Sequence, residues 1–369
     1  MKEKWYNLKS ILANNADYNI IFGERSNGKT YAVLKYMLER YIKNGVQGAI
    51  IRRWRDDFVG KRGASMFDAL VANNEVRNLT GGEWTDVYYF SGRWYLCRYN
   101  DKDERTTEER PFAYGFSLTT MEHDKSTSYP DVGTILFDEY LTRNGYLPDE
   151  FVLFTNVIST IIRHKTSIRG CDIKIFMCGN TVNKYACPYY SEMGLKHVKE
   201  MNPGDIDVYN YGDSGLKVAV EYCKPNKNGK PSDKFFAFDN PKLKMITGGA
   251  WEIGIYPHCP CKIRPKDIIF KYYIVFDSEI LECQVVRNEE MFFTFIHKKT
   301  TPLEELSSDL IFSTSFDARP NFRRKITKPR SDIEKRITEF YIKDKVFYDC
   351  NDTGEIVRNY LIWCGKEGV

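Results

Sequence analysis

Near its start the chain carries the string Gly23-Glu24-Arg25-Ser26-Asn27-Gly28-Lys29-Thr30. The string reads G-x-x-x-x-G-K-[ST], the pattern of a loop that wraps around nucleotide phosphates. In such a loop the backbone N–H groups and the lysine bind the phosphates. The final hydroxyl, here that of Thr30, is a ligand for Mg²⁺. The string therefore predicts that the chain binds a nucleoside triphosphate together with Mg²⁺.

The sequence on both sides of this loop fits the prediction. The run Tyr18–Phe22 before it is short and mostly apolar, which is typical of a buried strand. After the loop, Val33, Met37 and Tyr41 recur every four residues, as on one face of a helix, and Gly45 is suited to end that helix. A strand, a phosphate-binding loop and a helix in this order predict an α/β fold, the sheet of a P-loop ATPase with helices on both faces.

The composition suits a two-domain chain without disulfides. With 369 residues, of which 42% are apolar, the chain is long enough for two cores. Its net charge of +4 does not by itself indicate a nucleic-acid-binding protein. The 10 cysteines lack disulfide-framework spacing, and we find no signal peptide and no long apolar run. We therefore expect a reducing cytoplasm and no membrane partner. The run His258-Cys259-Pro260-Cys261 lacks a second ligand pair for zinc, so we expect buried or turn cysteines there.

A second strand-like run ends in two consecutive acids. Thr134–Phe137 consists of residues that favour strands, and Asp138 and Glu139 follow it. Ligands bind at the carboxyl ends of strands in open α/β sheets. Beside a phosphate-binding loop, Asp138 is the expected metal-side acid and Glu139 the expected general base, which favours hydrolysis over storage of the nucleotide. A strand that merely ends in solvated acids is the alternative.

A third strand-like run, Ile173–Cys178, leads to Gly179 and Asn180. A polar amide at this place lies beside the γ-phosphate in P-loop machines whose catalytic glutamate follows the metal aspartate. Asn180 is therefore a candidate to orient water or to hold Glu139 in an inactive rotamer. Asparagine is also common in turns that follow strands, so a purely local role is the alternative.

Two arginines are candidates for contacts with the γ-phosphate. Arg25 lies inside the loop, where its side chain can face Glu139 or the phosphate. Arg163 ends an amphipathic helical pattern, which is a natural place for an arginine finger offered to a neighbouring subunit. A cation that complements the negative end of the helix dipole is the alternative for Arg163.

Further basic residues stand at the end of another strand-like run and before the acid strand. Arg52, Arg53 and Arg55 follow the run Ala49–Ile51, and they are candidates to touch DNA phosphates or a neighbouring nucleotide. A solvated strand end is the alternative for these three residues. Lys125 precedes the acid strand and is a fourth candidate for DNA or trans contacts.

Together these residues resemble the DNA-packaging ATPases of small tailed phages of the phi-29 type, which are terminase-like. One point of likeness is the arginine at the third position of the loop, and another is the strand that ends in Arg-Arg-aromatic-basic. A third is the run Lys125-Ser126 followed by Tyr129-Pro130, which is not a general feature of P-loop proteins. The Arg163 helix and the strand into Asn180 come next in the same order. The likeness spans roughly residues 15–185.

The resemblance implies an ASCE-type ring motor, a homo-oligomer and most often a pentamer, at the portal vertex of a procapsid in the host bacterial cytoplasm. Such a motor uses ATP to drive double-stranded DNA inward, and in some cases a structural RNA takes part. In that setting Arg163 is the trans finger, Lys125 a trans or DNA-facing cation, and Asn180 the partner that releases Glu139. Two other functions stay open, a cellular-type DNA translocase or helicase and a nucleotide-gated assembly factor.

The order of the remaining segments predicts three parts. We expect an ATPase domain over residues 1–199, a linker region over 200–264 that contains a Pro/Gly/Lys-rich run, and a C-terminal domain over 265–369. In the last part, three strand-like runs precede two helical patterns: Ile268–Phe276, Ile280–Val286, Met291–Ile296, about 331–343 and about 353–364. Strands followed by helices suit a smaller α+β domain, and the resemblance implies a degenerate ribonuclease-H-like fold.

The C-terminal part lacks the pattern of an active nuclease. Two-metal cleavage needs several carboxylates within a few Å of one another. The local acids do not stand in a DxD or DxE pattern at the end of the first strand: Asp277, Glu282, Asp317 and Asp332. We therefore expect an ATPase without nuclease activity. Basic residues cluster between Lys298 and Arg336 instead, which suits contacts with RNA or DNA phosphates or else a solvated surface.

Overall fold

The computed structural model describes residues 5–120, 127–143, 145–225, 250–259, 261–288, 291–303 and 308–366. The chain divides into two compact units, Met1–Trp251 and Glu252–Val369. Within the described residues, none of the helices combines the length and the apolar character that a membrane span requires.

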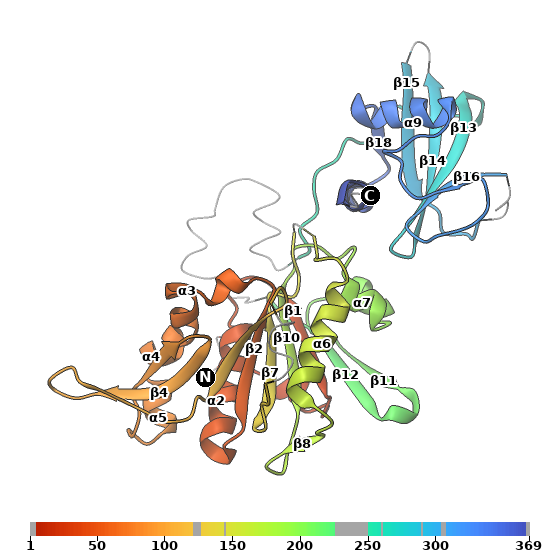
Figure 1. Ribbon diagram of the computed structural model, residues 1–369. Helices are drawn as coiled ribbons and strands as arrows, with labels where there is room; N and C mark the ends of the chain where they lie inside the picture. The colour runs from red at the N-terminus through yellow and green to blue at the C-terminus, as the bar shows by residue number, and fades with distance from the viewer. Residues whose placement is uncertain are drawn as a thin grey trace. The chain divides into compact units, whose positions relative to one another are not determined.

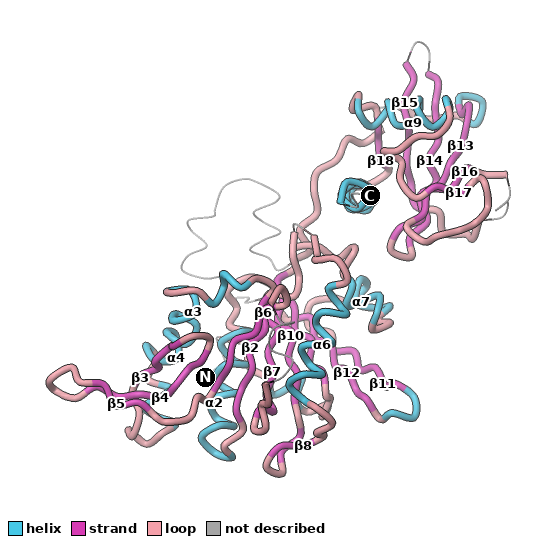
Figure 2. Tube along the Cα trace, in the orientation of Figure 1, coloured by secondary structure: helices cyan, strands magenta, loops and turns pink. Residues whose placement is uncertain are grey.

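The first unit is built on a ten-stranded sheet in the order β11-β12-β1-β10-β7-β2-β6-β4-β3, with β5 paired to β4 (Figure 2). Its strands are β1 (Tyr18–Gly23), β2 (Gln47–Arg52), β3 (Asp86–Phe90), β4 (Arg93–Tyr99), β5 (Arg105–Thr107), β6 (Ala113–Ser117), β7 (Val132–Asp138), β10 (Lys174–Asn180), β11 (Ile206–Tyr211) and β12 (Leu216–Tyr222). A separate short pair is formed by β8 (Ser167–Ile168) and β9 (Cys171–Asp172).

The centre of this sheet is parallel. Strands β12, β1, β10, β7, β2 and β6 pair in parallel, whereas β11 and β4 join the two sides antiparallel. Because parallel strands end at one edge, the last residues of β1, β10, β7 and β2 lie along the same edge: Gly23, Asn180, Asp138 and Arg52. The motifs that are far apart in the sequence are thereby brought together.

Helices cover both faces of the parallel strands (Figure 1), as the sequence predicts. Leu136 of β7 belongs to the core beneath α2 (Lys29–Asn44), together with Met37. The next residue, Phe137, points to the other face and stacks on Phe154 of α6 (Glu150–Ile162) at 5.2 Å between ring centroids. The remaining helices of the unit are short: α1 (Lys9–Leu12), α3 (Lys61–Ala64), α4 (Asp68–Ala72), α5 (Glu75–Leu79) and α7 (Pro188–Glu192).

The expected linker region does not match the structure. Residues 206–222 form β11 and β12, and β12 pairs with β1 from Tyr18 to Phe22. The division between the two units falls at residues 251 and 252 instead of at 199 and 264. A parallel partner for β1 completes its buried edge, which a composition-based boundary does not reveal. The Pro/Gly/Lys-rich run lies mostly outside the described residues.

The second unit is a six-stranded sheet in the order β17-β16-β13-β14-β15-β18, with two longer helices. Its elements are β13 (Ile268–Phe276), β14 (Glu279–Asn288), β15 (Met291–Lys298), β16 (Leu310–Ser313), β17 (Phe322–Arg323), α9 (Asp332–Ile342), β18 (Val346–Tyr348) and α10 (Asn351–Lys366). Asp277 and Ser278 have φ of 53° and 68°, the backbone that a two-residue hairpin turn needs. The three predicted strands and two predicted helices of this part are confirmed.

Candidate active site

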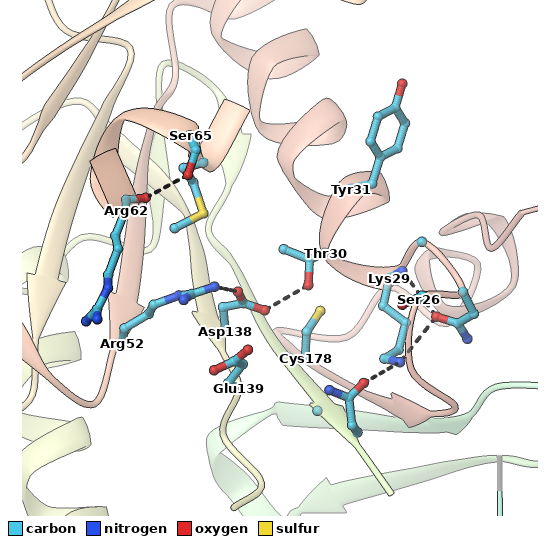
Figure 3. Close-up of a pocket in the computed structure, with 15 residues that line it drawn as sticks. Ser26, Lys29, Thr30, Tyr31, Arg52, Arg62, Ser65, Asp138, Glu139 and Cys178 are labelled. Carbon is cyan, nitrogen blue, oxygen red and sulfur yellow. Dashed lines mark hydrogen bonds and ion pairs between the residues drawn. The ribbon is translucent and has the colours of Figure 1, made fainter. Parts of the chain in front are cut away.

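A cavity of about 510 Å³ lies at the carboxyl edge of the parallel strands. Its lining comes from the loop after β1, the start of α2, the segment around α3, and the ends of β2, β7 and β10: Ser26, Asn27, Gly28, Lys29, Thr30, Tyr31, Arg52, Arg62, Ser65, Met66, Asp138, Glu139, Cys178, Gly179 and Asn180. Figure 3 shows these side chains converging from elements that are distant in the sequence. The predicted loop, acid pair and amide are thus brought to one site.

The phosphate-binding loop holds its lysine in place through oxygen acceptors of the chain itself. Lys29 Nζ donates to the carbonyl oxygen of Glu24 at 2.6 Å, to Asn27 Oδ1 at 3.2 Å and to Asn180 Oδ1 at 3.3 Å. Gly28 has a φ of 97°, which favours glycine, at the residue that precedes α2. The ammonium group is therefore positioned where incoming phosphate oxygens can replace its carbonyl and amide partners.

Thr30 and Asp138 lie in direct contact. The Thr30 hydroxyl donates to Asp138 Oδ1 at 2.8 Å, and Arg52 Nη2 donates to Asp138 Oδ2 at 2.5 Å (Figure 3). Burial lowers the pKa of the Arg52 guanidinium, but the charges of Asp138 and Glu139 outweigh this effect and raise it. The Nε–H group of Arg52 is buried and has no acceptor among the described residues.

This donor set fits a magnesium–phosphate ligand. A hydroxyl and a carboxylate side by side are the oxygen ligands that Mg²⁺ uses together with substrate phosphates. The unmet Nε–H of Arg52 beside them suits an anionic oxygen. Thr30 and Asp138 are therefore the residues that would hold Mg²⁺, and in the structure they are bound to each other, with Asp138 also bound to Arg52.

Glu139 stands next to Asp138 with its side chain exposed in the cavity. Its backbone has a φ of 60°, in the left-handed region that a glutamate seldom adopts. The following residue returns to the sheet, because Tyr140 N–H donates to the carbonyl oxygen of Cys178 at 3.2 Å. The backbone thus changes direction sharply at Glu139. As a result, the Glu139 side chain lies in the cavity and the Tyr140 side chain lies in the core.

Arg53 is not available for DNA or for a neighbouring subunit, contrary to the expectation from the sequence. Only 7% of it is exposed, and it is paired with Glu150 through two hydrogen bonds, from Nε to Oε2 at 2.8 Å and from Nη2 to Oε1 at 2.7 Å. The chain turns inward after β2, so Arg53 enters the core between β7 and α6. Arg52 therefore lines the cavity, whereas the next residue, Arg53, is buried in the core.

The other candidate cations lie outside this cavity. Arg25 and Arg55 are exposed and do not line it. Arg163 is also exposed, at the end of α6, where Nη2 donates to the carbonyl oxygen of Thr127 at 2.8 Å. Lys125 lies outside the described residues. None of the three described arginines therefore lines the cavity of its own chain.

Several residues that line the cavity were not predicted from the sequence. Arg62, Ser65 and Met66 come from the short helical segment around α3, which has no motif and no strong periodicity. A second cavity of about 750 Å³ lies beside the first, between residues 5–12 and α2, and shares Ser26, Gly28 and Tyr31 with it. No pattern noted in the sequence indicated this second cavity.

Comparisons with known proteins find one matching family and several similar proteins. Residues 1–195 match the family described as Podovirus DNA encapsidation protein (Gp16). The DNA packaging protein of Bacillus phage phi29 is 26% identical over 175 residues, which cover 46% of this chain and 45% of that protein. The DNA packaging protein of Bacillus phage B103 is 27% identical over 188 residues, half of each chain. The match thus spans about half the length of these relatives.

Two solved structures share the fold over nearly the whole chain. The bacteriophage phi-29 viral genome packaging motor assembly matches with a TM-score of 0.56 and 16% identity over 97% of each chain. The phi-28 gp11 DNA packaging motor matches with a TM-score of 0.52 and 18% identity over 100% of each chain. At these identities the likeness shows that the folds are related.

Proposed function

The chain belongs to the Podovirus DNA encapsidation protein (Gp16) family, and from this membership we propose that it is an ATP-driven motor that moves double-stranded viral DNA into a procapsid. The observation that carries the proposal is the meeting of Lys29, Thr30, Asp138 and Glu139 in one cavity. A phosphate-binding loop beside an acid pair is suited to hydrolysis of a nucleoside triphosphate as well as to its binding.

ATP occupies both cavities in this proposal. Its phosphates replace the partners of Lys29 and contact the N-terminus of α2, where the helix dipole favours negative charge. Its base enters the neighbouring 750 Å³ cavity, which Trp5, Tyr31 and Tyr36 line with aromatic rings. The shared residues Ser26 and Gly28 then mark the passage from triphosphate to nucleoside.

Thr30 and Asp138 would hold Mg²⁺ when the nucleotide is bound. The ion supplies charge neutralisation of the triphosphate. Arg52 gives up its contact with Asp138 in that state, and its guanidinium becomes free to face phosphate oxygens.

Glu139 accepts a proton from the attacking water, since its carboxylate is exposed in the cavity. Asn180 lies at the end of the neighbouring strand β10, and its amide oxygen accepts a hydrogen bond from Lys29. This bond is lost when Lys29 binds phosphate oxygens instead, so the side chain of Asn180 responds to nucleotide binding. We propose that Asn180 orients the attacking water or holds Glu139 in an inactive rotamer until the nucleotide is bound. Arg163 of a neighbouring subunit supplies the positive charge that stabilises the transition state.

A ring of identical subunits, with five as the proposed number, supports this use of Arg163. Its exposed position away from its own cavity is what a finger for a neighbour requires. Arg25 is proposed to face Glu139 or the γ-phosphate, and Arg55 and Lys125 are proposed contacts to the neighbour or to DNA. The ring docks on the portal of the procapsid in the host cytoplasm, and a structural RNA is a further proposed partner.

The second unit is proposed as a ribonuclease-H-like domain that no longer cuts DNA. The antiparallel meander β13-β14-β15, extended on the β13 side by the parallel strands β16 and β17, supports the fold. Glu282 on β14 is neutralised by Lys271 at 2.7 Å, which is unfavourable for a metal ligand of a nuclease. We propose that this unit serves attachment instead of cleavage.

The test is ATP turnover by the purified protein alone, with double-stranded DNA, and with procapsids plus DNA. We expect strong stimulation only when both are present, together with DNA that becomes protected from added nuclease. Glu139→Gln should abolish turnover and DNA protection while ATP binding stays within about twofold. Stimulation by DNA alone would indicate a general translocase, and protection that survives without turnover would indicate a nucleotide-gated assembly factor.

A further inference from the structure

Arg53 donates four hydrogen bonds, and two of them go to the backbone of Glu139 and Tyr140, which we call the catalytic segment. Its Nη1 donates to the carbonyl oxygen of Glu139 at 3.2 Å, and its Nη2 donates to the carbonyl oxygen of Tyr140 at 3.0 Å. Together with the two bonds to Glu150, four of its five N–H groups are used. The guanidinium also lies over the ring of Tyr146, 5.5 Å from its centroid.

Glu150, the partner of Arg53 in this ion pair, also takes part in four hydrogen bonds. It is 1% exposed and is the first residue of α6. One carboxylate oxygen accepts from Arg53 and from Tyr189 OH at 2.8 Å, and the other accepts from Arg53 and from Leu147 N–H at 2.8 Å. A buried ion pair is held only when such additional bonds satisfy both partners, so this pair has one fixed geometry.

The catalytic segment that Arg53 binds contains a residue with an unfavourable backbone conformation. Glu139 has a φ of 60°, and a residue in that region needs surrounding contacts to keep it there. Tyr140 is tied to β10 through its N–H group, whereas the carbonyl oxygens of Glu139 and Tyr140 are tied to Arg53. The direction of the Glu139 side chain follows from these backbone bonds.

We propose that Arg53, fixed by Glu150, is a positioning residue that holds the backbone of Glu139 so that its carboxylate points at the attacking water. This inference rests on the proposed function, since it takes Glu139 as the general base. Arg53 touches no substrate and acts only through Glu139. A base displaced by about 1 Å loses on the order of a hundredfold in rate, although the binding groups are intact.

The first variant is Arg53→Lys. A lysine keeps the charge but cannot form the bidentate pair and the two carbonyl bonds together. We expect kcat at saturating ATP to fall about 100-fold, while the affinity for ATP measured by equilibrium binding stays within about twofold.

The matched control is Arg40→Lys. Arg40 is similarly buried, and it contacts the start of β7, whereas Arg53 contacts the residues that directly follow the end of β7. Arg40 is 9% exposed and donates to the carbonyl oxygen of Gly133 at 3.0 Å and to Thr134 Oγ1 at 2.9 Å. If the role of Arg53 is merely structural, the two variants at equal Tm will lose kcat equally, and that result overturns the proposal.

A double variant separates positioning from every other role. On a Glu139→Gln background, Arg53→Lys should change the residual single-turnover rate by less than about threefold, because the group that it positions is gone. Arg40→Lys should lower the rate by the same factor on both backgrounds. A full 100-fold loss from Arg53→Lys on the Glu139→Gln background would show that Arg53 does not act through Glu139.

Tyr189→Phe serves if Arg53→Lys does not fold. It removes one hydrogen bond from Glu150 and keeps the ring, so we expect kcat to fall about 3- to 10-fold with unchanged ATP affinity. An unchanged kcat in a folded Tyr189→Phe protein contradicts the proposed positioning role of Arg53 and Glu150. Failure of the proposed function is distinguishable, because Glu139→Gln would then hydrolyse ATP at the rate of the unaltered protein.

Discussion

The hydroxyl of Thr30 donates a 2.8 Å hydrogen bond to the carboxylate of Asp138, although the two residues are 108 positions apart in the chain. The parallel pairing of β1 with β10 and of β10 with β7 brings them together at one edge. The other oxygen of Asp138 is bound by Arg52, so this carboxylate is neutralised from within the chain. Any cation that binds here has to compete with Arg52.

This competition predicts the effect of Arg52→Gln. Loss of the guanidinium leaves Asp138 without its counter-charge, so the Mg²⁺ concentration that half-saturates ATP binding should fall by about 3- to 10-fold. A titration of Mg²⁺ at fixed ATP, followed by equilibrium binding, measures it. Arg55→Gln, an exposed residue outside the cavity, should leave the midpoint unchanged. An unchanged or higher midpoint in Arg52→Gln would show that Arg52 does not compete with the ion.

Arg163 gives a prediction about subunit mixing. Arg163→Ala alone should lower kcat at least about 1,000-fold, the usual effect of losing an arginine finger. Rings mixed from Arg163→Ala and Glu139→Gln subunits should regain part of the turnover, because some interfaces combine an intact base with an intact finger. Mixtures of Thr30→Ala with Glu139→Gln are the control, since both changes spoil the site of their own subunit. An absence of recovery at every ratio would place Arg163 in its own subunit or in a structural role.

Gly179 is the residue of β10 that lets the catalytic segment pack. A Cβ atom there would lie 2.8 Å from the Tyr140 ring and 3.0 Å from Leu141, so one of them has to move. We expect Gly179→Ala to destabilise the protein by about 1–3 kcal/mol and to reduce turnover, because Tyr140 follows Glu139 directly. Urea unfolding and ATP turnover measure the two effects. Gly365→Ala, where a Cβ atom meets open space, should cost no stability.

Glu282 predicts a pH dependence of stability. Burial raises the pKa of this carboxyl, but the hydrogen bond from Lys271 and its charge outweigh that effect, so the pKa lies below its ordinary value of 4.5. A lowered pKa means that the ion pair stabilises the folded state above about pH 4.5 and that this contribution is lost as the pH falls through the lower folded value.

The measurement is Tm as a function of pH for Glu282→Gln. The variant should melt roughly 3 °C below the unaltered protein at pH 7, and the two should converge near pH 3. Glu339→Gln is the control, because the pair of Glu339 with Lys343 is exposed and contributes little at any pH. A difference that persists at low pH would mean that Glu282 stabilises the unit without its charge.

Short stretches of the sequence were enough to predict the chemistry of the site. The loop from Gly23 to Thr30 and the pair Asp138-Glu139 are contiguous, and their strands are apolar runs, so local pattern alone located them. The α/β class followed for the same reason, since a strand, a loop and a helix succeed one another within residues 18–44. In the second unit, local patterns also predicted strands β13, β14 and β15 and helices α9 and α10, whereas the short strands β16, β17 and β18 were not predicted.

Only the tertiary structure decided which basic residues serve the site. Arg52 and Arg53 are neighbours with the same side chain, yet one reaches the cavity and the other is buried against Glu150. Arg62 enters from a segment without a motif, and β12 extends the sheet beyond the predicted domain boundary. These outcomes depend on where the chain turns and on which distant strands pair. Such long-range packing leaves no periodic trace in the local sequence, whereas a phosphate-binding loop is specified by its own backbone.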